Sequence, residues 1–62
     1  MTSPPKYHIT TIEPELFLSI TPELKYGDII YYQRYNNGAL LVTKYMVRKH
    51  QHNSSKIIEQ IE

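Results

Sequence analysis

Residues 25–50 read "KYGDIIYYQRYNNGALLVTKYMVRKH", and this stretch decides the fold. Two runs rich in β-branched and aromatic residues flank the dipeptide Asn37-Gly38. Asn-Gly is the preferred pair for a two-residue type I′ turn, in which both residues take positive φ. The stretch therefore predicts a β-hairpin with arms at 29–35 and 39–49, launched by a turn at Gly27-Asp28.

The predicted hairpin has apolar side chains on both of its faces. A two-residue loop pairs Tyr35 with Leu40 and Tyr31 with Lys44, and successive side chains then alternate between the faces. One face carries Ile29, Tyr31, Gln33, Tyr35, Leu40, Val42, Lys44, Met46 and Arg48, and the other carries Ile30, Tyr32, Arg34, Leu41, Thr43, Tyr45 and Val47. A sheet with one solvated face should instead show a polar outer side. Either the strands curl into a small barrel or one face meets a partner.

The segments that flank the hairpin are less regular. Residues 1–5 are interpreted as a disordered terminus, and 6–12, "KYHITTI", as a first strand. Residues 12–24, "IEPELFLSITPEL", contain two similar five-residue motifs, "IEPEL" and "ITPEL". Pro14 and Pro22 each suit the first position of a helical turn. Between them, "LFLSI" fits either a short buried strand or a helical turn. Residues 54–62 are interpreted as a short helix, with a strand as the alternative.

Together these elements predict one small, mainly β domain over residues 6–62, with three to five strands and a short C-terminal helix. An SH3-like or OB-like partial barrel is the favoured architecture. The alternative is a ββ(α) unit that completes its core by dimerising. A chain of 62 residues buries only about 60% of the surface of its unfolded form, so a second copy is a plausible way to complete the core.

Composition narrows the class of protein. The chain has no cysteine, which fits a reducing compartment, and its apolar runs fall far short of the ~20 residues that a transmembrane helix needs. The start, "MTSPPKYH", lacks the apolar stretch of a secretory signal. We therefore expect a cytoplasmic protein with no membrane partner.

Net charge is +1, but the charges are unevenly distributed. Acidic residues gather in 13–28, whereas 29–58 contain no acid and carry Arg34, Lys44, Arg48, Lys49 and Lys56. Such asymmetry favours either an anionic partner or a fold in which the two parts face each other.

One stretch resembles a catalytic motif. "SITPELKYGDIIYY", residues 19–32, resembles the box around the catalytic serine of signal peptidases and LexA-type self-cleaving repressors, Ser-Met-x-Pro-x-Leu-x-x-Gly-Asp, with Ile20 where that family usually has Met. The resemblance implies Ser19 as nucleophile and Lys44 as its general base. The same residues are also explained by two turns followed by a strand. We adopt that interpretation and expect no enzymatic activity, because so small a domain can hardly bury a lysine deeply enough to deprotonate it.

Metal and cofactor sites are not expected. His50 and His52 share a face of an extended chain, and His8 could join them, but no cysteine and no nearby carboxylate completes a ligand set. The chain has two glycines, Gly27 and Gly38, and no glycine-rich loop that could cradle a phosphate.

The sequence thus favours a non-enzymatic protein-binding, adaptor or inhibitor module, and its size and composition suggest an accessory protein of phage or bacterial origin. We expect its partner to be another protein, including a second copy, bound through Tyr32, Arg34, Leu41, Thr43 and Tyr45. Tyrosine and arginine are enriched at interface centres. The alternative is a nucleic-acid-binding barrel that stacks bases on tyrosines between cations, using Tyr31, Tyr35, Arg34, Lys44, Arg48 and Lys49.

Overall fold

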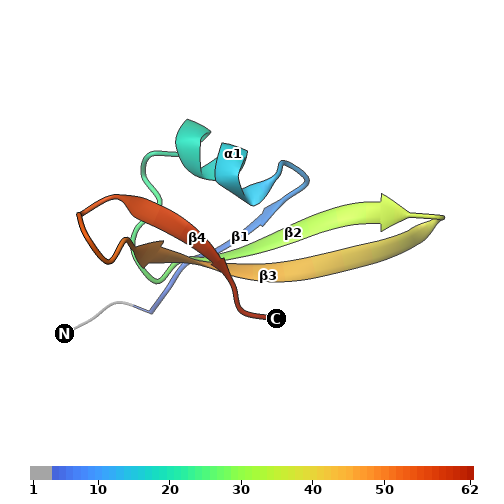
Figure 1. The fold of residues 1–62 in the computed structure, drawn as a ribbon. Helices are drawn as coiled ribbons and strands as arrows, with labels where there is room; N and C mark the ends of the chain where they lie inside the picture. The colour runs from blue at the N-terminus through green and yellow to red at the C-terminus, as the bar shows by residue number, and fades with distance from the viewer. Residues whose placement is uncertain (1–3) are drawn as a thin grey trace.

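The computed structural model describes residues 4–62 and shows an open four-stranded sheet with one short helix on one side (Figure 1). The elements are β1 (Tyr7–Thr10), α1 (Pro14–Ile20), β2 (Ile29–Asn36), β3 (Ala39–Lys49) and β4 (Lys56–Gln60). The strand order in the sheet is β1-β2-β3-β4, with β1 parallel to β2 and the other pairs antiparallel. The mainly β class is therefore confirmed. The interpretation of residues 1–5 as a tail falls partly on residues 1–3, which lie outside the described residues.

The central hairpin forms as the sequence predicts. Tyr35 pairs with Leu40 and Tyr31 with Lys44, and Asn36 and Ala39 close the loop. Asn37 and Gly38 have φ of 53° and 79°, so both residues of the turn lie in the left-handed region that a type I′ turn requires. The Asn-Gly dipeptide thus fixes the register, and the register decides which side chains share each face.

The sheet is not closed into a barrel. β1 and β4 lie at opposite ends of the strand order, so the expected SH3-like or OB-like closure does not form. The chain leaves β1 by way of α1 and returns to place β2 beside it in parallel, which is the standard use of a crossover helix. This arrangement puts α1 against one face of the sheet.

The repeated motif in residues 12–24 takes two different conformations. Its first copy opens α1, with Pro14 in the first turn and Glu13 at the N-cap without a side-chain capping bond. Its second copy forms a turn in which Leu24 N–H donates to Thr21 O at 3.2 Å. Leu24 is completely buried. Because a seven-residue helix is unstable alone, α1 depends on packing against the sheet.

The predicted C-terminal helix is wrong, because this segment forms the edge strand β4. On the edge of β3 away from β2, the backbone N–H and C=O groups of Tyr45 to Lys49 need partners. Residues 56–60 supply these partners by pairing with them in antiparallel register. Ile58 then packs against the core, while its neighbour Ile57 points to the other face. The apolar stripe that suggested a helix is divided between the two faces of a strand.

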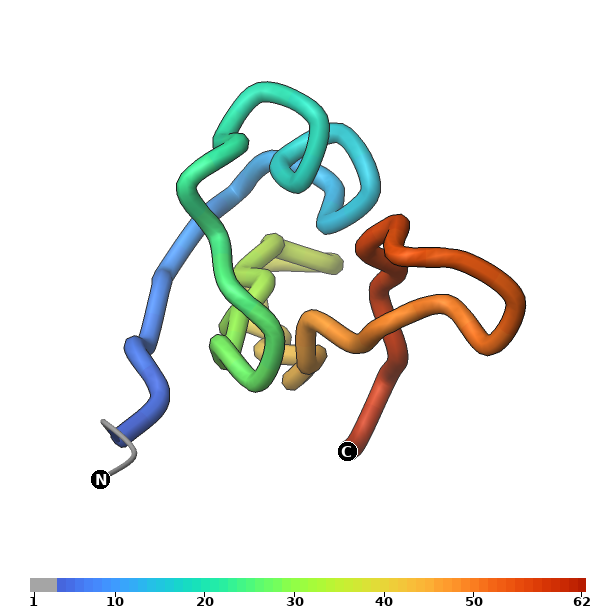
Figure 2. Tube along the Cα trace, turned by 90° about the vertical axis from the view of Figure 1, so that its left-hand side faces the viewer, coloured from blue at the N-terminus to red at the C-terminus, as the bar shows by residue number. Residues whose placement is uncertain are grey.

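The core lies at one end of the hairpin, between α1 and the sheet. It consists of Leu24, Ile30 and Val47, with Phe17, Leu18, Tyr45 and Ile58 packed around them. The far end of the hairpin projects well beyond α1, as Figure 1 shows. We call this far end of β2 and β3 the projecting arm, and Figure 2 views it nearly end-on. The radius of gyration of 12.3 Å exceeds the ~11 Å of a compact chain of this length, consistent with the projecting arm.

Within the described residues, α1 is too short to cross a lipid bilayer.

Candidate functional site

The sheet has a covered face and an open face. The covered face carries the even-numbered residues of β2 and the odd-numbered residues of β3, including Ile30 and Val47 beneath α1. The open face carries the odd-numbered residues of β2, the even-numbered residues of β3 and their neighbours on β1 and β4. Within residues 4–62, no helix or strand packs on this open face.

The open face is apolar and strongly exposed. Tyr7, Ile9 and Tyr35 are 64%, 69% and 77% exposed. Six of its side chains are large, apolar and exposed: Tyr7, Ile9, Tyr35, Leu40, Val42 and Ile57. An exposed apolar surface of this kind on a small protein usually marks an interaction site.

Two cations of the open face, Lys44 and Arg48, each lie near a neighbouring side chain. The rings of Tyr7 and Tyr31 stack with centroids 5.8 Å apart, and Lys44 Nζ lies 5.9 Å from the centroid of Tyr31. At the end nearest β4, Arg48 Nε lies 2.9 Å from Glu59 Oε1. The arrangement is an aromatic and aliphatic surface with a neutralised ion pair at one end.

The five residues predicted to bind a protein lie on the covered face and have different surroundings. Tyr45 packs against the core, whereas Arg34 and Leu41 are exposed on the projecting arm. A groove of about 420 Å³ separates the start of α1 from the arm. It is lined by Glu13, Pro14, Glu15, Tyr32, Arg34, Tyr45, Ile58 and Gln60. The structure therefore brings three of the five together, namely Tyr32, Arg34 and Tyr45.

The six residues of the nucleic-acid alternative are divided between the two faces. Tyr31, Tyr35, Lys44 and Arg48 lie on the open face. Arg34 and Lys49 lie on the covered face. One continuous path for a nucleic-acid strand across all six residues would have to pass around the hairpin.

The serine and lysine of the protease-like motif do not meet. Ser19 lies in α1 on the covered side, where its Oγ donates to the backbone oxygen of Leu16 at 3.0 Å. Lys44 lies on the open face, above the ring of Tyr31. The sheet separates the two side chains, so Lys44 is not placed to take a proton from Ser19.

The three histidines do not form a cluster. His50 and His52 are adjacent in the loop before β4, where His52 N–H donates to His50 Nδ1 at 3.1 Å. His8 lies on β1, with Nε2 at 3.2 Å from Asp28 Oδ2. In the part of the chain that the structure describes, no group of three metal-ligating side chains comes together.

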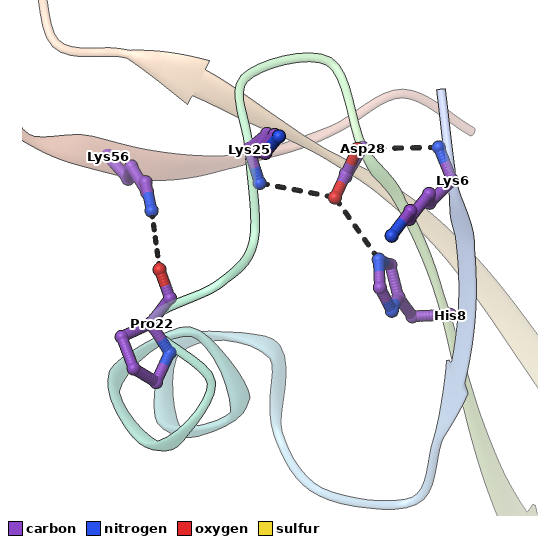
Figure 3. A network of polar contacts seen from close by, with 6 residues as sticks. All are labelled: Lys6, His8, Pro22, Lys25, Asp28 and Lys56. Atoms are coloured by element: carbon purple, nitrogen blue, oxygen red, sulfur yellow. Dashed lines mark hydrogen bonds and ion pairs between the residues drawn. The ribbon is translucent and has the colours of Figure 1, made fainter. Parts of the chain in front are cut away.

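Asp28 holds the start of the sheet together, which the sequence did not predict. Its buried carboxylate accepts hydrogen bonds from the backbone N–H groups of Lys6 and Lys25 and contacts His8, as Figure 3 shows. Burial by itself raises the pKa of Asp28, but the Lys25 N–H, the His8 side chain and the Lys6 N–H together lower it below its ordinary value of 3.8. The charged carboxylate thus ties β1 to the turn before β2. A second tether in Figure 3 joins Lys56 Nζ to Pro22 O at 2.9 Å.

Comparisons with protein-family models, with curated proteins and with solved structures find no match to this chain. Sequence reasoning recognised that the hairpin has two apolar faces, but it did not place Tyr7, Ile9 and Ile57 on one of them. Tyr7 and Ile9 alternate along one strand and therefore share a face, but alternation does not show which strand pairs with theirs.

Proposed function

We propose that this chain is a non-enzymatic protein-binding module whose main contact surface is the open face of the sheet. The observation that carries the proposal is the cluster of exposed apolar side chains there, from Tyr7 on β1 to Tyr35 near the hairpin tip. Tyrosine and other apolar side chains are enriched at interface centres, and the cation Lys44 lies among them over the ring of Tyr31.

The projecting arm offers a second contact surface on the covered face of the sheet. Arg34 and Leu41 are exposed there, and Tyr32, Thr43 and Tyr45 lie between them and the core. An isolated two-stranded hairpin is marginally stable in water, so an arm that extends beyond its supporting elements gains from a partner that covers it. We therefore keep these five residues in the proposed binding surface, as its secondary part.

Nucleic-acid binding is the second candidate. Tyr31, Tyr35, Lys44 and Arg48 share the open face, and stacking on exposed tyrosines beside cations is a common way to hold a single strand. The pairing of Arg48 with Glu59 works against this candidate, because it withdraws one cation and adds an acidic group near the phosphate path. Protein binding is the better supported of the two.

Site-specific photo-crosslinking in the native cell tests the proposal. A photoreactive phenylalanine analogue replaces Tyr35, which is highly exposed on the open face, and in a control it replaces the exposed Asn53 in the loop before β4. We expect discrete protein adducts from position 35 and none from position 53. Adducts with nucleic acid would favour the second candidate, and the absence of any macromolecular adduct from position 35 would contradict both.

A further inference from the structure

The chain buries very little apolar surface by itself. Among residues 4–62, the side chains that are completely buried are Leu24, Ile30 and Val47. The chain has no disulfide to supplement this core, because it contains no cysteine. Many domains of this size fold alone, but their stability is marginal, and disulfides, a metal or oligomerisation commonly add to it. The open face is the largest reserve of apolar surface that remains.

The amount of apolar surface on the open face matches one side of a stable interface. Its six exposed apolar side chains are between 37% and 77% exposed. At roughly 150–200 Å² for each residue, aromatic or aliphatic, they present on the order of 500–700 Å². A standard protein interface takes about 800 Å² from each partner. A partner that covers the whole face would therefore bury an area typical of specific complexes.

The open face is also compatible with a copy of itself. The cross-strand pair Gln33 and Val42 lies on the half of this face nearer the hairpin tip, between the pair Tyr31 and Lys44 and the tip pair Tyr35 and Leu40. The Gln33 amide both donates and accepts, so two such amides can pair across a two-fold axis. Arg48 is paired with Glu59 at the β4 edge of the face. Lys44 lies on the central strands beside the Gln33–Val42 pair, and its long stem lets the ammonium extend past the Tyr31 ring toward water.

We infer that the open face is covered by a second copy of this chain, in a two-fold symmetric dimer centred on Gln33 and Val42. The inference rests on the proposed function and names the partner for its main surface. The two sheets stack face to face, with Tyr7, Ile9 and Tyr35 of each copy against the sheet of the other. A symmetric pair uses the same patch twice, which is the commonest arrangement among homo-oligomers. The projecting arm is then supported along one whole side.

Single cysteines provide a direct test, because the natural chain has none. Val42→Cys places a thiol on the open face at the proposed two-fold axis, and Leu41→Cys places one on the opposite face of the same strand. Both positions are exposed, so neither change removes a core side chain. We expect a dimer mass for the unmodified chain in sedimentation from low to high micromolar concentration. Mild oxidation should link Val42→Cys into a covalent dimer much faster than Leu41→Cys.

The outcomes separate this inference from the proposed function. A monomer mass throughout the concentration range overturns the inference, as does a dimer that Leu41→Cys links at least as fast as Val42→Cys. If the chain is a monomer but position 35 still crosslinks to a different protein in the cell, the proposed function stands and only the identity of the partner changes. If neither sedimentation nor photo-crosslinking finds a protein partner, both proposals fail.

Discussion

The rings of Tyr7 and Tyr31 stack on the open face of the sheet, with centroids 5.8 Å apart and planes 22° apart. The stack joins β1 to β2 on the side away from α1, where solvent reaches it in a single copy. Aromatic pairs contribute about 0.5–1.5 kcal/mol beyond their buried area, and they contribute most to binding when water is excluded. This pair therefore stabilises the parallel edge of the sheet and prepares a rigid aromatic surface for a partner.

The type I′ turn should be sensitive to the residue at position 38. Gly38 has φ of 79°, and a side chain added there meets open space, so the cost of substitution lies in the backbone conformation. Gly38→Val should lower the free energy of unfolding by more than ~1 kcal/mol, because β-branched residues resist positive φ. Asn37→Gly, which tolerates the same conformation, is the control. Equal denaturation midpoints for Gly38→Val and the unmodified chain would exclude this account of the turn.

The carboxylate of Asp28 should make stability depend on acid pH. Its pKa in the folded protein is lowered below 3.8, so the stability that it contributes is complete well above that value. That contribution is lost as the pH falls through the lowered folded pKa. Asp28→Asn should cost on the order of 1–3 kcal/mol at neutral pH and should flatten the loss of stability between about pH 4 and pH 2.

Denaturant unfolding at several pH values measures both effects of Asp28→Asn. Glu23→Gln, which changes an exposed acid in the preceding turn, is the matched control and should leave the curve nearly unchanged. If Asp28→Asn and Glu23→Gln behave alike, the Asp28 network does not hold β1 to the turn.

Tyr45 should behave as a core residue although it lies on the proposed secondary surface. It packs against the cluster of Leu24, Ile30 and Val47, so Tyr45→Ser should destabilise the fold by about 2–4 kcal/mol. Leu16→Ser, at a position on α1 that is more than half exposed, should cost less than about 1 kcal/mol. Thermal unfolding compares the two variants. A Tyr45→Ser variant as stable as Leu16→Ser would show that Tyr45 is free to serve binding alone.

Ser19 should have no catalytic role. Its Oγ donates a hydrogen bond to the backbone oxygen of Leu16 within α1, and Lys44 lies on the other face of the sheet. Ser19→Ala should change stability by no more than about 0.5 kcal/mol, and a fluorophosphonate probe should leave the protein unlabelled. Mass spectrometry detects the adduct. Specific labelling of Ser19 would revive the resemblance to the serine–lysine peptidases.

The sequence predicted the parts of this fold that local chemistry determines. Asn37 and Gly38 fix the hairpin and its register because few other conformations suit that dipeptide. Pro14 likewise marks the start of α1, since it needs no hydrogen-bond donor there.

The sequence did not predict the elements whose conformation depends on pairing between distant segments of the chain. Ile57 and Ile58 fit either a helix or a strand, and the open edge of β3 selects the strand. The parallel pairing of β1 with β2 depends partly on Asp28, whose bonds to Lys6 and His8 join segments about 20 residues apart. The two-faced hairpin was visible in the sequence, but which face α1 covers was not.

Intermolecular nuclear Overhauser effects in a mixture of isotope-labelled and unlabelled chains test the central claim most directly. Leu41 and Val42 are neighbours in β3 whose methyl groups lie on opposite faces, so they report on the two faces independently. A dimer formed through the open face predicts intermolecular contacts from the Val42 methyls to tyrosine rings of the second copy, and none from the Leu41 methyls. Contacts from Leu41 alone, or no intermolecular contact on the open face at high concentration, would contradict it.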